Sequence, residues 1–383
     1  MIATTLFGLE EIVAKELQTL GATKIEPLNR AVRFYGNQKM LYKANLHLRT
    51  ALKVLKPLAQ FLVHDDRDLY KKMQRIDWEQ YLSRKGTLAI EATVNGDYFT
   101  HSQYVALKSK DAIVDQFREN YGIRPSIDLE DPDLRINIHI KDRTCSVSLD
   151  SSSTSLGKRG YRQAQSLAPM SEVLAAGIIA LSGWDKQTDI LDPMCGSGTF
   201  AIEAAMLACN MAPGRLRNFG FEHWKDFDAD LLKAVKEEAD NQIQEPKCKI
   251  YGSDIDKRAV DISTSNAQNA QVGKFIKFKQ QDFINTEEHF ENGILLINPP
   301  YGERLKEEDE IIPFYQEIGT HMKHYCEGCE AWIISSNLRA LKFVGLRPSR
   351  KIRLFNGPLD CRLYKFELFK GKKAMHKANQ QDS

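Results

Sequence analysis

The spacing of hydrophobic residues along the first part of the chain predicts short helices and strands. Residues 7–21 place apolar side chains on one helical face and end at Gly21, and residues 31–35 alternate apolar and polar side chains as a strand does. Residues 37–54 continue with a second helical pattern. We therefore expect a small α/β unit over residues 1–60.

A second block, residues 61–155, again mixes helical and strand patterns. Residues 87–94 read as a strand and residues 102–121 as an amphipathic helix. Residues 134–140 and 144–149 both alternate strictly, and the short polar turn between them predicts a β-hairpin. This order predicts an α+β domain.

From residue 169 onward, strand patterns alternate with helical patterns. The predicted strands cover residues 188–192, 249–253, 275–279, 293–298 and 331–335. The predicted helices cover residues 170–181, 199–211, 257–272 and 314–324, and a closing hairpin covers 351–355 and 363–368. Such alternation is typical of a parallel sheet covered by helices, so we expect a Rossmann-like α/β domain over residues 169–370.

Polar segments separate and follow these domains. Residues 156–168 are small and polar, with Lys158, Arg159 and Arg162 around two glycines, and predict a linker. We expect a solvated loop, with the alternative that these cations also touch a nucleic-acid backbone. Residues 209–245 lengthen the first half of the α/β domain as an insertion, and the basic tail 371–383 is expected to be disordered.

Composition narrows the function only slightly. Lys and Arg number 53 against 51 Asp and Glu, so the formal charge of +2 neither favours nor excludes a nucleic-acid partner. The seven cysteines are irregularly spaced, and the Cys326–Cys329 pair has no second pair, so we expect reduced thiols and no metal. No signal peptide is evident and no apolar run reaches the roughly 18 residues of a membrane span, which favours a cytoplasmic protein without a membrane segment.

The first candidate site is segment 191–199, Leu-Asp-Pro-Met-Cys-Gly-Ser-Gly-Thr, which follows a predicted strand and opens a predicted helix. Gly196 and Gly198 let the backbone approach a ligand closely, and a helix start offers free N–H groups. The third glycine of a dinucleotide-binding turn is missing, because position 201 is Ala, and no Gly-Lys-Ser/Thr of a P-loop is present. This segment alone fits a purely structural turn equally well.

Acidic residues follow the next two predicted strands. Asp254 stands where a carboxylate can accept both ribose hydroxyls of a nucleoside, and Asp282 could accept an adenine amino group while the Phe283 ring covers the base. A single Asp at such a place is more typical of a turn or a helix cap. Three successive strand ends with such residues favour one ligand site at the carboxyl edge of the sheet.

The fourth strand end carries Asn298, Pro299, Pro300 and Tyr301. Two prolines directly after a buried strand end the ladder and form a rigid turn. The Asn298 side-chain oxygen and the Pro299 carbonyl could each accept an N–H of an exocyclic amine, which would aim its lone pair at a methyl donor. The Tyr301 ring offers a stacking face for a base. Positioning of this kind lowers the barrier of a group transfer.

These segments resemble those of the class I methyltransferases that act on amino groups. Residues 192–200 look like their first cofactor motif, 252–256 like the ribose motif, 280–283 like the adenine motif and 298–301 like the catalytic motif. Residues 149–162 and 298–305 are similar to the bacterial large-subunit (23S) ribosomal RNA guanine-N2 methyltransferases, in the half that carries a THUMP domain. The resemblance spans nearly the whole chain.

The resemblance implies S-adenosylmethionine as cofactor, RNA as partner, no metal, and a ferredoxin-like unit (1–60) ahead of a THUMP domain (61–155). By position, it implies that the methionine end of the cofactor is lined by Asp192, Met194, Cys195, Gly196, Ser197, Gly198 and Thr199. Asp254 would take the ribose, Asp282 and Phe283 the adenine, and residues 298–301 the target base, which must leave its stack. Cys195 would serve packing and not act as a nucleophile.

Three alternatives stay open at this point. The Asn-Pro-Pro-Tyr motif also serves adenine-N6 methyltransferases of DNA or RNA. The THUMP-like region argues against a DNA substrate. A non-catalytic RNA-binding or assembly factor would be expected to have lost one of residues 298–301, which are intact. An NAD-dependent oxidoreductase is disfavoured by the missing third glycine and by the same motif.

Overall fold

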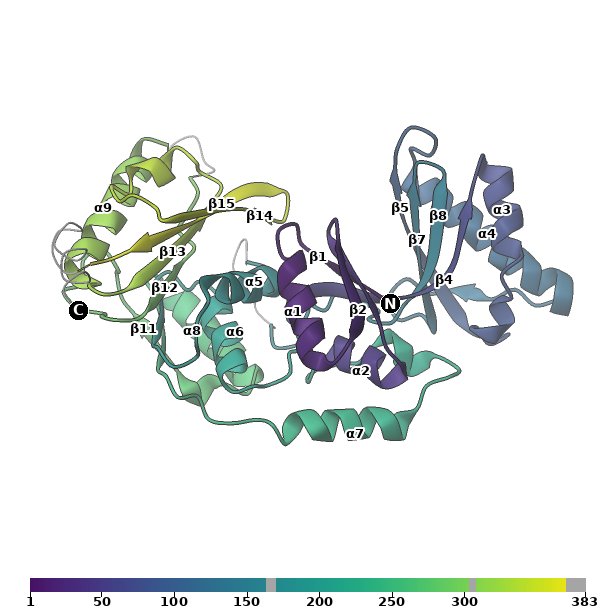
Figure 1. The fold of residues 1–383 in the computed structure, drawn as a ribbon, viewed down its shortest axis with the longest axis horizontal. Coiled ribbons are helices and arrows are strands. Elements are labelled where there is room, and N and C mark those ends of the chain that lie inside the picture. Colours follow the sequence, from purple (N-terminus) through teal and green to yellow (C-terminus); the bar gives the residue numbers. More distant parts are fainter. Residues whose placement is uncertain (163–169, 303–307, 370–383) are drawn as a thin grey trace. The chain divides into compact units, whose positions relative to one another are not determined.

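The structure is a computed structural model that describes residues 1–162, 170–302 and 308–369 (Figure 1). The chain forms two compact units, each assembled from separate segments. Unit 1 contains Met1–Thr5, Val13–Leu156 and Arg217–Glu238, and unit 2 contains Leu6–Ile12, Gly157–Leu216 and the chain from Ala239 onward. The predicted tail 371–383, part of the predicted linker (163–169) and residues 303–307 lie outside the described residues.

An eight-stranded sheet of order β2-β3-β1-β4-β8-β7-β5-β6 forms the centre of unit 1. Its strands are β1 (Ile2–Thr5), β2 (Thr23–Leu28), β3 (Ala31–Tyr35), β4 (Ala51–Leu62), β5 (Thr87–Asn95), β6 (Ser126–Ile127), β7 (Leu134–Lys141) and β8 (Thr144–Asp150). The helices are α1 (Glu10–Leu20), α2 (Gln38–His47), α3 (Asp66–Gln74), α4 (Ser102–Tyr121) and α7 (Ala229–Asp240), with short 3₁₀ turns η1 (Trp78–Gln80) and η2 (Gly220–His223). Helices α1 and α7 each extend from one unit into the other. The predicted hairpin is confirmed as β7 and β8, which pair antiparallel.

Strand β4 joins the two N-terminal blocks of the sequence into one sheet. Its first half pairs with β1 and its second half with β8, so Leu55 lies opposite both Ile2 and Asp150. The helix predicted over 37–54 is therefore wrong at its end, because α2 stops at His47 and a strand begins at Ala51. The apolar spacing there fits either element, and pairing with distant strands decides for the strand.

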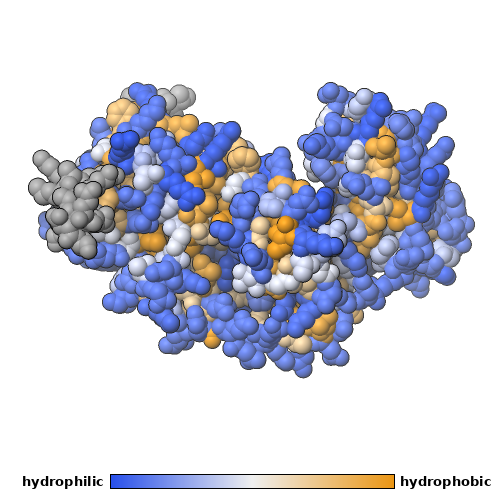
Figure 2. All heavy atoms as spheres, in the orientation of Figure 1, coloured by the Kyte–Doolittle hydropathy of each residue, from blue (hydrophilic) through white to orange (hydrophobic). Residues whose placement is uncertain are grey.

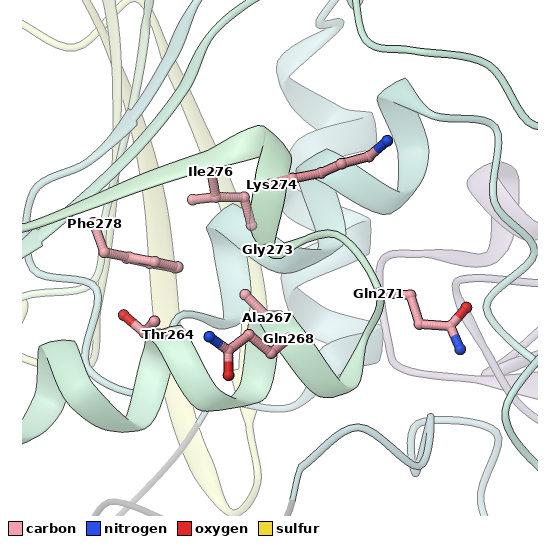
Figure 3. Close-up of a pocket in the computed structure, with 8 residues that line it drawn as sticks. All are labelled: Thr264, Ala267, Gln268, Gln271, Gly273, Lys274, Ile276 and Phe278. Carbon is pink, nitrogen blue, oxygen red and sulfur yellow. The ribbon is translucent and has the colours of Figure 1, made fainter.

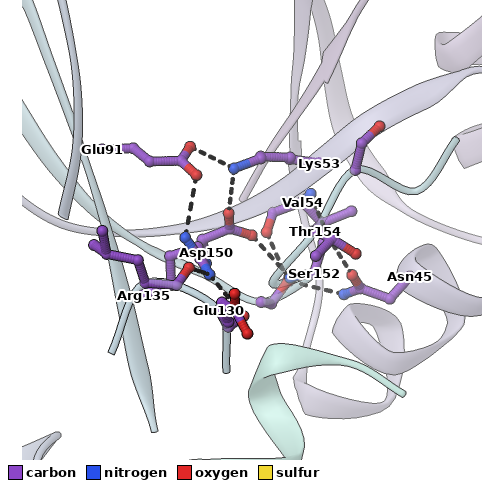
Figure 4. A network of polar contacts seen from close by, with 12 residues as sticks. Asn45, Lys53, Val54, Glu91, Glu130, Arg135, Asp150, Ser152 and Thr154 are labelled. Carbon is purple, nitrogen blue, oxygen red and sulfur yellow. Dashed lines mark hydrogen bonds and ion pairs between the residues drawn. The ribbon is translucent and has the colours of Figure 1, made fainter. Parts of the chain in front are cut away.

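A polar network lies where β4 meets β8 (Figure 4). Asp150 is fully buried, and Lys53 Nζ lies 2.8 Å from its Oδ2 and 2.6 Å from Glu91 Oε2. Arg135 extends the network to Glu91 at 3.3 Å. Burial by itself would lower the pKa of Lys53, but the attraction of Asp150 and Glu91 raises it, so the ammonium stays charged. The buried carboxylate thus has a cation at hydrogen-bond distance, as a buried charge requires.

Part of the insertion that the sequence predicted over residues 209–245 belongs to unit 1. Within segment Arg217–Glu238, the ring of Phe221 stacks on Tyr42 at a centroid distance of 4.3 Å and on Phe219 at 5.2 Å. The Tyr42 hydroxyl also accepts the backbone N–H of Asp228 at 3.0 Å. Unit 1 is therefore completed by residues that follow the start of unit 2 in the sequence.

A seven-stranded sheet of order β11-β10-β9-β12-β13-β15-β14 forms the centre of unit 2. Its strands are β9 (Ile190–Asp192), β10 (Ile250–Asp254), β11 (Ile276–Gln280), β12 (Ile294–Ile297), β13 (Glu330–Ser335), β14 (Arg350–Asn356) and β15 (Leu359–Glu367). Strands β9 to β13 are parallel, and β15 pairs antiparallel with both β13 and β14. The Rossmann-like prediction and the closing hairpin are confirmed.

Helices cover both faces of this sheet. They are α5 (Glu172–Ser182), α6 (Thr199–Ala208), α8 (Lys257–Asn269) and α9 (Glu308–Tyr325), with 3₁₀ turns η3 (Gly273–Phe275) and η4 (Ala340–Phe343). Leu295 and Ile297 of β12 pack in one core with Tyr315 and Ile318 of α9, and alternation turns Ile294 and Leu296, which are also buried, to the opposite face. The carboxyl ends of β9, β10, β11 and β12 therefore share one edge, between two buried faces.

Hydrophilic and hydrophobic residues are mixed on the face of the molecule that Figure 2 shows. Hydrophilic residues predominate in the view of Figure 2, and the hydrophobic patches between them are interrupted. Within the described ranges, every helix is too short or too polar to span a lipid bilayer.

Candidate active site

The turn after β9 is built so that backbone, and not side chains, faces its centre. Gly196 and Gly198 adopt φ of +52° and +80°, which favour glycine. A Cβ on Gly198 would lie 2.8 Å from the Ser263 side chain, so no other residue fits there without displacement. Gly198 is also the N-cap of α6, whose first N–H groups have no partner within the helix. The turn can therefore cradle an anionic or polar ligand group.

Asp254, at the end of β10, binds this glycine turn directly. Its Oδ2 accepts the Gly196 N–H at 2.9 Å, and its Oδ1 accepts the Asp256 N–H at 3.0 Å. The neighbouring Cys195 N–H donates to the Ser253 carbonyl at 2.9 Å. A carboxylate has about four acceptor positions, so Asp254 keeps capacity for ribose hydroxyls. The structure thus brings Asp254 and the glycine turn together.

Asp192 lies beneath the same turn and is 1% exposed. The Met194 backbone N–H donates to its carboxylate, whereas Oδ1 has no hydrogen-bond partner among the described residues. Burial, and secondarily repulsion from Asp254, raises the pKa of Asp192 well above its usual range. A buried acceptor without a partner suits a ligand that brings a cationic N–H group. The donor set of this turn therefore fits the α-amino-acid end of S-adenosylmethionine.

Asp282 and Phe283 follow β11 at the same edge, but their side chains are engaged locally. Asp282 Oδ1 accepts the Ile284 N–H at 3.0 Å, and Oδ2 accepts from Asn285 Nδ2 at 2.6 Å. Phe283 is 5% exposed and packs edge-on against His321 at a centroid distance of 4.4 Å. No described contact brings either side chain to the glycine turn, so their role at an adenine stays a prediction.

The turn after β12 carries residues 298–301 in a tightly bonded arrangement. The Tyr301 hydroxyl donates to Asn298 Oδ1 at 2.7 Å, and Tyr315 donates to the Pro300 carbonyl at 3.1 Å. Pro299 is buried and Pro300 is exposed. Burial raises the pKa of Tyr301, so its hydroxyl stays protonated and able to donate. The Asn298 oxygen expected to receive a substrate amine is therefore held by an internal donor.

The predicted linker was expected to be a solvated loop, and this expectation is wrong for Arg159, Tyr161 and Arg162, which are buried wholly or largely. Arg159 and Glu203 form an ion pair at 3.3 Å with side chains 1% and 0% exposed, and the Tyr161 hydroxyl donates to Glu203 at 3.4 Å. Arg162 is also buried to a large extent, whereas Lys158 is exposed. The compensating carboxylate lies more than forty positions away along the chain, so the linker composition could not reveal it.

Arg162 is a site residue that the sequence did not indicate. Its Nη1 donates to Ser197 Oγ at 3.1 Å, and its Nη2 donates to Thr199 Oγ1 at 3.0 Å and to the Met170 carbonyl at 3.1 Å. Its Nε donates to Glu172 at 2.9 Å. These contacts use four of the five N–H groups of the guanidinium and hold both hydroxyls of the glycine turn. The aromatic Tyr161 beside Arg162 was a sequence signal of burial.

The seven cysteines are buried and free of disulfides. Burial raises the pKa of Cys326 to about 12 and that of Cys329 to about 11, so both remain thiols at neutral pH. Burial likewise raises the pKa of Cys195, which packs behind the glycine turn. In the part of the chain that the structure describes, no group of three His, Cys, Asp or Glu side chains could hold a metal ion.

A cavity of about 480 Å³ lies between α8 and β11 (Figure 3). It is lined by Thr264, Ala267, Gln268, Gln271, Gly273, Lys274, Ile276 and Phe278. Phe278 separates it from the glycine turn, since its ring lies 3.2 Å from where a Cβ on Gly198 would stand. None of the predicted site residues lines it, and we assign it no ligand.

Residues 159–365 match the RMKL-like methyltransferase domain family, which is more than half of the chain. This chain belongs to that family. Residues 1–55 match the RlmL ferredoxin-like domain and residues 63–150 match the THUMP domain. Most of the N-terminal part of this RMKL-like methyltransferase is therefore assigned to known domain families as well. The predicted family is confirmed.

The names of two relatives agree with this assignment. A Synechocystis protein provisionally named an RNA methyltransferase is 40% identical over 96% of each chain. The ribosomal RNA large subunit methyltransferase K/L of Syntrophotalea carbinolica is 38% identical over 96% of this chain and 53% of that protein. The chain therefore spans about half the length of the second relative.

Solved structures show the same fold for the whole chain. A protein provisionally named a methyltransferase and crystallised with S-adenosylhomocysteine is 32% identical, with a TM-score of 0.85 over 97% of this chain and 98% of that chain. A Listeria monocytogenes protein named as a predicted N6-adenine-specific DNA methylase is 29% identical, with a TM-score of 0.85 over 96% and 95%. The predicted cofactor, S-adenosylmethionine, is thereby confirmed.

Proposed function

We propose that this RMKL-like methyltransferase transfers a methyl group to the exocyclic N2 of a guanine in large-subunit (23S) ribosomal RNA. The proposal is supported by the Asn298–Tyr301 turn, which lies at the same sheet edge as the glycine turn. The THUMP match and the names of the two relatives favour RNA, and one of those names specifies ribosomal RNA of the large subunit.

The cofactor would be held by residues that we assign by position and geometry. The turn Met194–Thr199 would surround the methionine end, with Asp192 accepting from its ammonium and Asp254 accepting from the ribose. Asp282 and Phe283 would meet the adenine after a local rearrangement, because both are engaged elsewhere. S-adenosylmethionine, when bound, supplies the methyl group from its sulfonium.

Substrate binding would exchange one hydrogen bond for another at Asn298. The Tyr301 hydroxyl now occupies Asn298 Oδ1, and a guanine amine would replace it as donor while the Pro299 carbonyl accepts the second N–H. Such an exchange costs little, because no acceptor is left unsatisfied. The freed Tyr301 ring could then stack on the flipped base. The carbonyl and amide oxygens would orient the nitrogen lone pair during transfer, S-adenosylhomocysteine would leave, and the methylated nitrogen would release one of its two protons to water.

The decisive test is methyl transfer from labelled S-adenosylmethionine to ribosomal RNA that lacks the modification. We expect the Asn298→Ala variant to lose at least about 100-fold in rate, as enzymes do when one preorganised hydrogen bond to a reacting group is removed. Its affinity for S-adenosylhomocysteine should stay near that of the wild type, because Asn298 is not assigned to the cofactor. Equal rates for variant and wild type would remove Asn298 from the reaction.

Adenine-N6 methylation is the second candidate. It is favoured by the same Asn-Pro-Pro-Tyr turn and by the name of the Listeria monocytogenes neighbour. Offering duplex DNA beside ribosomal RNA, and digesting both products to nucleosides for mass spectrometry, separates the two. Methyladenine in either product, without N2-methylguanine, would replace the first proposal by the second.

A further inference from the structure

The segment between β13 and the end of β14 concentrates positive charge beside residues 298–301, which we call the catalytic turn on the proposed function. Residues 336–356 contain six cations and no acidic residue. The cations, all exposed, are Arg339, Lys342, Arg347, Arg350, Lys351 and Arg353, and we call them the cationic rim. The whole chain carries a formal charge of only +2, so this stretch is a strong local asymmetry.

Hydrogen bonds connect the start of this segment to the catalytic turn. Asn337 Nδ2 donates to the Tyr301 carbonyl at 3.0 Å, and Asn337 Oδ1 accepts the Ala340 N–H at 2.9 Å, where η4 begins. Ser335 Oγ accepts the Asn337 N–H at 3.0 Å and lies 2.7 Å from the Tyr315 hydroxyl, which also bonds Pro300. The first rim cation, Arg339, therefore follows a residue that touches the catalytic turn.

The segment is fixed on helix α9, at the end of the sheet that β14 and β15 form (Figure 1). Ala340, Leu341 and Val344 are buried in the same core as α9. A Cβ on Gly319 would lie 1.7 Å from the Val344 carbonyl oxygen, so the two backbones are in direct contact there. Buried apolar residues thus hold the backbone while the cations between them point to solvent.

Among the described residues, only one of the six rim cations has a counterion, and three have no partner of any kind that the structure shows. Arg353 pairs with Asp360 at 2.8 Å, Arg350 donates to the Leu181 carbonyl at 3.4 Å, and Lys351 lies over the Tyr364 ring at 5.0 Å. Arg339, Lys342 and Arg347 form no ion pair with any described residue. Uncompensated like charges in a short segment repel one another, and a polyanion relieves that repulsion.

We propose that the cationic rim binds the phosphates of the RNA strand next to the base that enters the catalytic turn. This inference rests on the proposed RNA methyltransferase function and adds a second RNA-binding surface, within the methyltransferase unit itself. A base leaves its stack only if the flanking backbone is held, and each neutralised phosphate releases counterions that favour binding. The rim is well placed for this, because Asn337 connects it to Tyr301.

The test is a triple neutralisation, Arg339→Gln with Lys342→Gln and Arg347→Gln. We expect RNA binding to weaken at least about tenfold at 0.1 M salt, and the slope of log K against log salt to fall by about 2, since each lost phosphate contact removes about 0.7–0.9. The KM for RNA should rise while kcat at saturating RNA and the affinity for S-adenosylhomocysteine stay unchanged. A charge-retaining triple, Arg339→Lys with Lys342→Arg and Arg347→Lys, should behave as wild type and so excludes misfolding.

The matched control removes three exposed cations from the opposite, amino edge of the same sheet. These are Lys186, Lys247 and Lys277, each changed to Gln, which gives the same change in net charge. If the rim variant binds RNA as this control does, with the same salt slope, the rim proposal is overturned. If the wild-type protein neither binds nor methylates RNA, both the proposed function and the rim proposal are wrong. If the wild type methylates RNA and only the rim variant behaves as the control does, the rim proposal alone is wrong.

Discussion

In each unit, one central strand ends in a buried aspartate, and the charged neighbours of the two aspartates differ. Asp150, at the end of β8, is 0% exposed and has the Lys53 ammonium at 2.8 Å. Asp192, at the end of β9, is 1% exposed and has Asp254 as its charged neighbour, with Oδ1 unpartnered among the described residues. Burial raises the pKa of both carboxyl groups, but the neighbouring charge opposes that shift at Asp150, where it is a cation, and adds to it at Asp192, where it is a second carboxylate.

We propose that this difference separates a structural carboxylate, Asp150, from one that binds a ligand, Asp192. A buried charge without a partner lowers stability, so it persists where binding requires it. Near Asp150, the network of Lys53, Glu91 and Arg135 fixes the junction of β4 and β8. Near Asp192, the missing cation is the group that S-adenosylmethionine would bring. Three substitutions test this contrast.

The largest effect is expected for Lys53→Met, which removes the cation and leaves Asp150 buried alone. We expect unit 1 to lose about 3 kcal/mol of stability, at the low end for a broken buried pair because Lys53 is partly exposed. Hydrogen exchange of the β4 and β8 amides measures this locally. Lys56→Met is the control on the same strand, because its exposed pair with Asp226 should contribute no more than about 1 kcal/mol. If the β4 and β8 amides exchange equally fast in both variants, the ion pair of Asp150 with Lys53 contributes no more to stability than a surface ion pair does.

A second, smaller effect is expected for Asp192→Asn. The variant should bind S-adenosylhomocysteine more weakly by about 1.5–3 kcal/mol, roughly ten- to hundredfold, which is typical of a lost hydrogen bond to a charged group. The ligand-free variant should be at least as stable as the wild type at neutral pH, because it lacks a carboxyl group whose ionisation burial opposes. Calorimetry and thermal unfolding measure the two quantities, and a variant that loses stability without losing affinity would make Asp192 structural.

The raised pKa of Asp192 gives this prediction a pH dependence. The folded protein holds the proton more tightly than the unfolded chain, whose Asp titrates near about 3.9. The ligand-free wild type should therefore lose stability, relative to Asp192→Asn, as the pH rises from about 4 to the raised pKa. Affinity for S-adenosylhomocysteine should rise over the same window, since its ammonium favours the ionised carboxylate. An affinity that does not change with pH over this window would contradict the assignment.

The smallest effect is expected for Arg162→Met. The guanidinium holds Ser197 and Thr199, and we propose that its remaining N–H donates to the carboxylate of the cofactor, with the start of α6 as a second anion site. We expect about a tenfold loss of affinity for S-adenosylhomocysteine, equal to one charge-assisted hydrogen bond. Affinity for methylthioadenosine, which lacks the amino-acid end, should be unchanged. Arg162→Lys should recover part of the loss, and Lys158→Met should have no effect. Equal losses for both ligands would indicate a general distortion of the turn.

The sequence predicted best those elements whose pattern is local. Helix α4 covers the predicted residues 102–121, and β7 and β8 begin at the predicted residues. It failed where distant partners decide, as at β4, whose apolar residues also fit a helix until β1 and β8 pair with it. The return of segment Arg217–Glu238 to unit 1 depends on stacking against Tyr42, which no local pattern reveals.

The candidate site follows the same rule. Residues that stand directly at strand ends, such as Asp254 and Asn298, could be named because the carboxyl ends of parallel strands meet at one edge. Arg162 could not, because its partners Ser197 and Thr199 lie beyond a predicted strand and its segment reads as polar loop. The bond between Tyr301 and Asn298 was also hidden, since it depends on a side-chain conformation.

The return of Arg217–Glu238 to unit 1 has a consequence for the order of events during translation. When Leu156 has left the ribosome, the Tyr42 ring still lacks Phe221, and the aromatic surface stays open until that later segment is made. At about 5–20 residues per second, this interval lasts on the order of ten seconds. A nascent chain would therefore expose this surface while the glycine turn of unit 2 is already being synthesised.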